Sequence, residues 1–392
     1  MRVRRGAQFT ALLALLLLVP ALFAIKPDTT SESPWFLFEI MDHGVASQDI
    51  SGSQIAYTTS GPPPLVTVID IGSGQTRLLE DFRPCGEFFV IDKVRIDGDW
   101  LVAEIKCLDV SEPFFQSHVH NLKTGETFLL QPEPSDPALP YSWYTDIDSG
   151  RVVWSQLAGC DGGDVYLLDL ETRDLTKVTD GPDGKAKLDL HLGPEWLVWD
   201  EINPADREFS LRGANLVTSQ TITVTHGSRS TGYVPLSGSG AIVWTESVIG
   251  PNQVWAYDLQ TQDTYQLSTA GDPLFAFDLS GNLLVLVDSV ELGEVTRPAT
   301  MRTGASSEYP TEPCEHLRPY AGSHNRVRIH NLASHTDEYI YFNPEARYIS
   351  NARIDQLTVI WDEYAGQYPD DTQRVLAARR FEHQFYMPLV FR

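Results

Sequence analysis

The sequence predicts an all-β fold, a seven-bladed β-propeller of four-stranded antiparallel blades, with six or eight blades as the less favoured counts. Three observations lead to this fold. One hairpin pattern recurs seven times, a second turn pattern follows most of its copies, and successive copies lie about 45 residues apart over most of the chain. A repeat of four short strands at this spacing is typical of a propeller blade.

The hairpin pattern consists of a short strand, a turn containing Gly, Asp or Ser, and a second strand rich in β-branched and aromatic residues. Such a pattern predicts an antiparallel strand pair. The copies read DISGSQIAYTT, RIDGDWLVAEI, DIDSGRVVWSQ, HLGPEWLVWDE, LSGSGAIVWTE, DLSGNLLVLVD and RIDQLTVIWDE. We expect one recurrent large position in the second strand to pack between blades, because each blade must bury both faces. Its occupants are Tyr57, Ala103, Trp154, Trp199, Trp244, Leu286 and Trp361.

The turn pattern is an Asp or Asn, an aliphatic residue and then a turn rich in Ser, Thr or Gly, as in LDLETRDL and YDLQTQDT. The side chain of an Asp or Asn at this place can accept backbone N–H bonds from the turn that follows. We therefore predict a structural role, between the third and fourth strands of a blade, for Asp70, Asn121, Asp169, Asn215, Asp258 and Asn331.

The chain divides into three parts. Residues 1–24 combine an Arg-rich start, an apolar run and small residues at the end, which predicts a cleaved secretory signal peptide, with a retained membrane anchor as the alternative. Residues 25–45 are expected to be a lead-in segment and residues 46–392 the propeller, with a long insertion at about residues 289–325. We expect the last repeat to supply all four strands of its own blade, although WFLFEI at residues 35–40 could pair with it.

The charge balance excludes some partners. The chain has 29 Lys and Arg against 53 Asp and Glu, a formal net charge of -24. A protein that binds nucleic acid needs a basic face, so no nucleic-acid partner is expected. After signal cleavage no segment is apolar and long enough to span a membrane. We therefore expect a monomeric protein that is secreted, periplasmic or at the cell surface.

The four cysteines are expected to form two disulfides, because an exported protein meets an oxidising compartment. Cys85, Cys107, Cys160 and Cys314 all map to predicted loops, or loop-facing strand ends, on one face of the ring. The predicted hairpin near Gly98 favours pairing Cys85 with Cys107, which leaves Cys160 with Cys314. None of the four has the spacing of a zinc site.

Acidic residues recur at the loop-facing ends of the second strands and in the adjoining loops. They are Glu201, Glu246, Asp288, Glu363, Asp161 and Asp164. One hypothesis is a ligand-binding face lined with carboxylates, suited to Ca²⁺ or a cationic ligand, because hard cations take several oxygen ligands. The favoured interpretation is that these carboxylates are solvated side chains on the surface of a strongly acidic protein. No cofactor is expected, with Ca²⁺ as the alternative.

The repeats DIDSGRVVWSQ...GGDVYLLDLETRDLTKVTD and LSGSGAIVWTE...NQVWAYDLQTQDTYQLST resemble those of TolB-like (WD40-like) β-propeller proteins of the exported bacterial type. The resemblance covers nearly the whole mature chain. It implies a platform that binds proteins or ligands, often without catalysis. The chain lacks the SPDG turn of many relatives and a second domain, so a translocation partner of the TolB kind does not follow.

The GxSxG, HExxH and P-loop motifs are absent from the sequence. We therefore expect an exported, non-catalytic propeller that acts as a scaffold for a protein, peptide or glycan at the channel-mouth face. One alternative is a carbohydrate-active propeller enzyme, a glycoside hydrolase or lyase, with acids in its central channel. The other is a calcium-dependent adhesion module of the cell surface.

Overall fold

The computed structural model describes most of the strands and tight turns. The described residues are 35–41, 45–59, 64–79, 89–108, 114–131, 141–157, 163–179, 184–203, 208–228, 236–238, 240–246, 253–268, 274–288, 326–343, 346–365 and 372–380.

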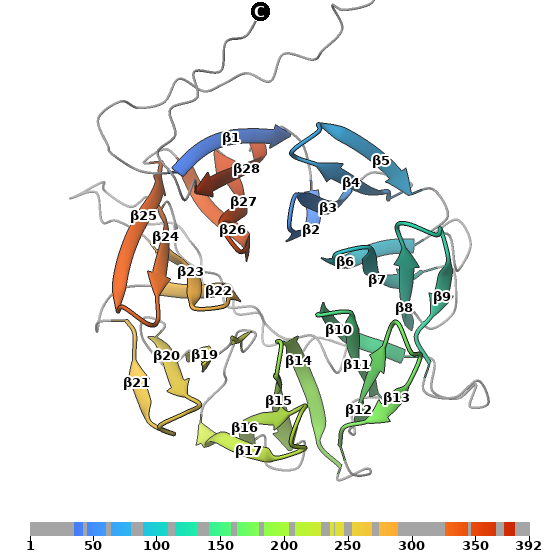
Figure 1. The fold of residues 1–392 in the computed structure, drawn as a ribbon, viewed down its shortest axis with the longest axis vertical. Helices are drawn as coiled ribbons and strands as arrows, with labels where there is room; N and C mark the ends of the chain where they lie inside the picture. Colours follow the sequence, from blue (N-terminus) through green and yellow to red (C-terminus); the bar gives the residue numbers. More distant parts are fainter. Residues whose placement is uncertain are drawn as a thin grey trace, which may run out of the picture.

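In this part of the chain, 28 strands form seven four-stranded antiparallel sheets, arranged as blades around a common centre (Figure 1). The predicted seven-bladed propeller is thus confirmed. The first three blades, listed from inner to outer strand, contain β2 (Val45–Ser51), β3 (Gln54–Thr59), β4 (Val66–Asp70) and β5 (Gln75–Leu79); β6 (Phe89–Asp97), β7 (Trp100–Cys107), β8 (Phe114–Asn121) and β9 (Thr127–Leu129); β10 (Tyr141–Asp148), β11 (Arg151–Leu157), β12 (Gly163–Asp169) and β13 (Leu175–Lys177).

The next three blades follow the same order of strands. They contain β14 (Ala186–Leu192), β15 (Trp196–Asn203), β16 (Glu208–Asn215) and β17 (Thr221–Ser228); β18 (Leu236–Ser237), β19 (Ala241–Glu246), β20 (Gln253–Asp258) and β21 (Thr264–Gln266); β22 (Leu274–Ser280), β23 (Leu283–Asp288), β24 (Arg326–Asn331) and β25 (Thr336–Phe342). The expected insertion therefore joins the second and third strands of blade six, and its residues 289–325 lie outside the described part.

Blade seven corrects one expectation. The last repeat supplies only β26 (Ala346–Asp355), β27 (Thr358–Ala365) and β28 (Thr372–Arg380), and the fourth strand is β1 (Trp35–Met41) from the other end of the chain (Figure 1). β1 pairs antiparallel with β28, with Trp35 opposite Arg380. Leu37 packs against the core between blades six and seven, and Ile40 against the core between blades seven and one. The expected lead-in thus includes the strand that closes the ring.

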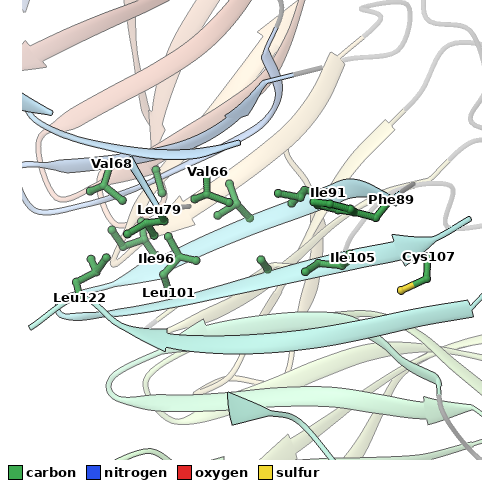
Figure 2. Close-up of a cluster of buried hydrophobic side chains, with 13 residues drawn as sticks. Val66, Val68, Leu79, Phe89, Ile91, Ile96, Leu101, Ile105, Cys107 and Leu122 are labelled. Atoms are coloured by element: carbon green, nitrogen blue, oxygen red, sulfur yellow. The ribbon is translucent and has the colours of Figure 1, made fainter. Parts of the chain in front are cut away.

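The hydrophobic core lies between blades rather than inside them. Figure 2 shows the cluster between blades one and two, where Val66 and Leu79 meet Ile91 and Leu101. The recurrent large position of the hairpin pattern takes part in these clusters, as in the contact of Trp244 with blade four. All seven occupants of that position are at most 8% exposed. Their predicted packing role is confirmed.

The Asp or Asn of the turn pattern also has the predicted role. In each of the six turns its Oδ1 atom accepts backbone N–H groups of the turn, for example from Gln260 and Thr261 to Asp258, each at 2.8 Å. The fourth residue after the Asp or Asn has a positive φ in all six turns. Glycine fills this place twice, as Gly74 and Gly125, and the other four occupants are Arg173, Ser219, Gln262 and His335.

Other predictions fall on residues outside the described part of the chain. These are the signal peptide at 1–24, the insertion, Cys85, Cys160, Cys314 and Asp161. The side chain of Cys107 is fully buried at the end of β7, and its pairing stays a prediction. Within the described residues no helix is both long and apolar enough to cross a membrane.

Candidate functional site

One position on the inner strand of every blade points to the candidate site. In each blade it pairs with the residue directly before the recurrent large position, as Asp49 does with Ala56 and Arg95 with Val102. We call the seven residues at this position the axial ring. They are Asp49, Arg95, Asp146, His191, Leu236, Asp278 and Arg353.

Acidic and basic residues alternate around the axial ring, interrupted only by Leu236. Arg95 Nε lies 3.5 Å from Asp146 Oδ1, and Arg353 Nε lies 3.7 Å from Asp49 Oδ1. His191 Nε2 lies 3.7 Å from Asp278 Oδ1. Each of the three carboxylates therefore has a basic group beside it.

Each of the three aspartates also ties its own blade to the next, so that three of the seven junctions are linked in this way. Ile96, Leu192 and Ile354 each donate a backbone N–H at 2.8 Å to the Oδ2 atom of the ring aspartate in the preceding blade. The backbone ladders of the seven sheets are separate, so links between inner strands must come from side chains. A buried backbone N–H needs such a partner, since leaving it unpaired costs about 1–3 kcal/mol.

A second set of links lies two residues further along the inner strands, at the turn to the second strand. Gly98 donates its N–H to Ser51 Oγ at 2.9 Å, and Gly150 donates to Asp97 Oδ2 at 2.7 Å. Asp355 of blade seven accepts the N–H of Gly52 in blade one, across the point where the ring closes. Polar side chains thus hold the ring together at two levels.

The backbone beside the axial ring is unusual. Tyr144, Asp189 and Asn351 have φ values of 55°, 49° and 48°, and each lies two residues before a ring residue. The strand register shifts at the same places. Non-glycine residues adopt this conformation at a cost of about 1–3 kcal/mol and persist in it where the surroundings enforce it. Such positions are concentrated at functional sites.

Burial and neighbouring positive charge shift the pKa values of the ring aspartates in opposite directions. Burial raises the pKa of Asp49 to about 6, although the charges of Arg95 and Arg353 pull it down. Burial also acts to raise the pKa of Asp278, but the hydrogen bond from His191 and the charge of Arg353 outweigh it and lower the pKa. Equivalent carboxylates therefore differ in how readily they take up a proton.

Lys93 and Glu104 add a second charged pair beside the ring. Lys93 lies two residues before Arg95, and its Nζ donates to the carbonyl oxygen of Thr145 at 2.8 Å. Glu104 accepts from the N–H and hydroxyl of Thr145 at 2.5 and 2.7 Å. Burial lowers the pKa of Lys93 and raises that of Glu104. Blades two and three are joined through Thr145 by both members of this pair.

A polar cluster lies where blade seven meets blade one. Gln48 donates its Nε2–H to the carbonyl oxygen of Asn351 at 3.3 Å, and Asn351 donates its Nδ2–H to Asp362 Oδ2 at 2.7 Å. Asp362 is fully buried, and burial raises its pKa to about 7. Gln373 accepts from the N–H of Val45 and donates to its carbonyl oxygen, at 3.0 and 2.8 Å. Side chains thus link blade seven to blade one at several places.

The five described acids of the set singled out from the sequence lie on five different blades, and most have their own partners. Lys185 Nζ lies 2.7 Å from Glu201, and Arg326 binds Asp288 through Nε and Nη2 at 2.5 and 2.7 Å. Glu363 accepts from Tyr341 and Arg374.

The two other described acids of that set lie on β12 and β19. Asp164 lies 2.7 Å from Lys177, and Glu246 is half-buried at the end of β19. Among the described residues, no group of three or more His, Cys, Asp or Glu side chains could hold a metal ion.

The axial ring escaped the sequence prediction, although its signal was present. Its members are the first letters of the seven hairpin copies, D, R, D, H, L, D and R. The alternation of charge becomes meaningful only when the repeats are closed into a circle, because neighbours in the ring are separated by a whole blade in the chain.

Comparisons with known proteins bear on the fold. No family model matches the chain, and no curated protein sequence matches it. Among solved structures, the chain is similar to the β-propeller domain of the Trilobed protease from Pyrococcus furiosus, described as having an open velcro topology. The TM-score is 0.54 at 10% identity, over 90% of this chain and 100% of that one.

Two further similar structures are larger proteins. Puromycin hydrolase gives a TM-score of 0.54 at 9% identity over 82% of this chain and 50% of that one. The acylaminoacyl peptidase of Pyrococcus horikoshii gives 0.52 at 11% identity over 86% and 52%. The chain thus spans about half the length of these two, and the similarity shows the propeller fold alone.

Proposed function

We propose that the protein is an exported, disulfide-containing propeller of the TolB-like kind that acts as a non-catalytic binding scaffold. Its binding face is the loop face, meaning the face with the loops between second and third strands and between consecutive blades. The ligand is a protein, a peptide or a glycan. Loops carried by a rigid ring are suited to this task because the scaffold fixes their positions while their sequences vary.

The pairing of the loop-face acids carries this proposal. A glycoside-cleaving site needs one carboxyl group that holds a proton and a second that is free to act as base or nucleophile. Glu201, Asp288 and Glu363 instead each contact a cation, namely Lys185, Arg326 and Arg374. Carboxylates held by cations in this way stabilise strand ends, and their contacts are made within the protein.

The similar structures support the propeller fold on which this proposal builds. The chain covers 100% of the length of a propeller domain among them. The activities of the larger similar proteins are properties of those proteins, and the proposal takes over none of them.

The test is a binding screen followed by a turnover assay. The purified protein is applied to glycan and peptide arrays, and each ligand bound is then incubated with it and analysed for cleavage. We expect saturable binding of an intact ligand and a melting temperature unaffected by a calcium chelator. Release of reducing sugar that is lost in Glu201→Gln or Glu246→Gln would contradict the proposal and favour the carbohydrate-active enzyme. A drop in melting temperature with chelator would favour the adhesion module.

A further inference from the structure

We propose that the junction of blades seven and one is held together by a proton, which Asp362 carries on Oδ1 and donates to Oε1 of Gln48. We call this junction the seam. It is tight at low pH and looser at high pH, so closure of the ring responds to pH. This role is independent of the proposed binding function. It rests on two buried oxygen atoms that find no hydrogen-bond donor among the described residues.

Asp362 lies on the face of β27 that is turned toward blade one. Successive side chains of a strand point to opposite faces of the sheet. Trp361 packs in the core between blades six and seven, whereas Ile360 packs in the core between blades seven and one. Asp362 therefore shares the face of Ile360. Gln48 of β2 reaches the seam from blade one, because it donates to the carbonyl oxygen of Asn351.

The hydrogen bonds at the seam form a chain that lacks one donor. Gln48 donates from Nε2 to the carbonyl oxygen of Asn351 at 3.3 Å, and Asn351 donates from Nδ2 to Oδ2 of Asp362 at 2.7 Å. The atoms left over at the two ends are Oε1 of Gln48 and Oδ1 of Asp362, both buried and both without a partner among the described residues. Both are acceptors while Asp362 is ionised. A proton on Oδ1 turns this atom into a donor and completes the chain.

Burial makes the ionised form of Asp362 unfavourable. Asp362 and Gln48 are 0% and 1% exposed, and a buried charge needs a close opposite charge or several donors. Burial raises the pKa of Asp362 to about 7, although hydrogen bonds from Asn351 and Gln373 and the charge of Arg353 act to lower it. The proton that the hydrogen-bond chain lacks is therefore bound at and below neutral pH.

Two further acids stand next to the residues of the seam. Glu363 follows Asp362 on β27 and accepts from Arg374. Asp49 follows Gln48 on β2 and accepts from the N–H of Ile96 in blade two. Burial raises the pKa of Asp49 to about 6, so its titration must be separated from that of Asp362.

The direction of the response follows from the pKa of Asp362. The value is 3.8 in the unfolded chain and about 7 in the folded protein, so folding favours the protonated form. The contribution of the seam is fully present below pH 3.8 and is lost as the pH rises through about 7. Above that pH, two acceptor oxygens are left without a donor between them, and the link from blade seven to Gln48 weakens.

The first experiment is a pH titration of the full protein, followed by the infrared absorption of protonated carboxyl groups. We expect a carboxyl band that disappears with a midpoint near pH 7 and is missing from Asp362→Asn. The band of Asp49 remains in that variant, which separates the two acids.

A matched pair of variants tests the partner of the proton. Gln48→Met removes the acceptor of the protonated form, so it should lower the midpoint of Asp362 by about one pH unit. Gln373→Met removes a donor to the ionised form and should raise the midpoint. A wild-type band without a midpoint near neutral pH, or a midpoint raised in Gln48→Met as in Gln373→Met, would overturn the proposal.

The second experiment measures the seam itself and needs only the wild type and Asp362→Asn. This variant keeps an oxygen for Asn351 and offers an N–H to Gln48, as the protonated acid does. The amide of Val45, which donates to Gln373 at 3.0 Å, reports on the seam by hydrogen–deuterium exchange corrected for the intrinsic effect of pH. We expect its protection to fall about tenfold above pH 7 in the wild type and to stay constant in Asp362→Asn.

The amide of Leu192 is the control, because it donates to Asp146 at the junction of blades three and four. Its protection should not depend on the residue at position 362. Equal protection of Val45 in the wild type and Asp362→Asn at every pH would also overturn the proposal. Binding of an array ligand is not affected by that outcome, so the two proposals fail separately.

Discussion

His191 Nε2 lies 3.7 Å from Asp278 Oδ1, although the two residues belong to blades four and six and all of blade five separates them in the chain. Ser237 of blade five donates its backbone N–H to His191 Nδ1 at 3.2 Å, which leaves Nε2 to carry the proton that faces Asp278. Blade five contributes an inner strand of two residues and the uncharged Leu236. Side chains of blades four and six thus meet near the centre of the ring, where the inner strand of blade five is short.

The first prediction concerns Gly238, a glycine at which blade five comes close to blade six. A Cβ atom on Gly238 would lie 2.5 Å from the carbonyl oxygen of Gly281, which is backbone and cannot easily move. We expect Gly238→Ala to lower the free energy of unfolding by about 1–3 kcal/mol through overpacking, measured by urea denaturation. Gly240→Ala is the matched control, because nothing lies within 4 Å of its Cβ position. Equal stability of the two variants would show that blades five and six are not in close contact.

The second prediction concerns the positive-φ position of the outer turns. Ser219 and Gln262 occupy it with φ values of 60° and 63°, where Gly74 and Gly125 stand in other blades. This conformation costs a non-glycine residue about 1–2 kcal/mol. A glycine avoids that cost, but it also raises the conformational entropy of the unfolded chain, which offsets part of the gain. We expect Ser219→Gly and Gln262→Gly each to raise the free energy of unfolding by about 0.5–1 kcal/mol. Gly125→Ala should lower it, and a loss of stability in all three would contradict the assignment.

The third prediction concerns pH. The pKa of Asp362 is raised from 3.8 to about 7, so the folded protein binds a proton that the unfolded chain releases between these values. Stability from this group is fully present below pH 3.8 and is lost as the pH rises through 7, with a difference on the order of 4 kcal/mol. The isosteric Asp362→Asn variant should lose less stability than wild type between pH 5 and 8 in denaturant titrations.

Asp258 provides the control for this experiment. Hydrogen bonds from the Thr261 N–H and its neighbours lower its pKa, so its contribution is lost as the pH falls below its ordinary range and is constant from pH 5 to 8. Asp258→Asn should therefore leave the slope in that window unchanged. A wild-type slope that persists in Asp362→Asn would show that Asp362 is ionised in the folded protein.

The fourth prediction concerns ring closure. A variant that begins at His43 lacks β1 and leaves the edge of β28 unpaired, whereas one that begins at Ile25 keeps it. We expect the shorter variant to melt at a lower temperature and to exchange the amides of Val375–Arg380 faster, measured by hydrogen–deuterium exchange. Equal exchange in the two variants would mean that β1 does not close the ring.

The features repeated in each blade were predictable from the sequence, whereas closure of the ring by residues 35–40 was predictable only as an alternative. Trp154 and Asp169 stand at fixed places in a local pattern, so their packing and turn roles were predictable from one repeat at a time. The pairing of Trp35 with Arg380 joins the two ends of the chain, and no local pattern encodes it. The ion pair of Arg353 with Asp49 likewise joins the last blade to the first, so no local pattern encodes it. The loop-face acids were recognisable in the sequence by residue type, but their partners, Lys185 just before β14 and Arg326 of β24, were not.

The most direct test of the axial ring is a crystal structure of the protein. We predict that Ile96 donates its backbone N–H to Asp49 and that Arg353 lies beside the same carboxylate. An Asp49 side chain that makes neither contact would contradict the account.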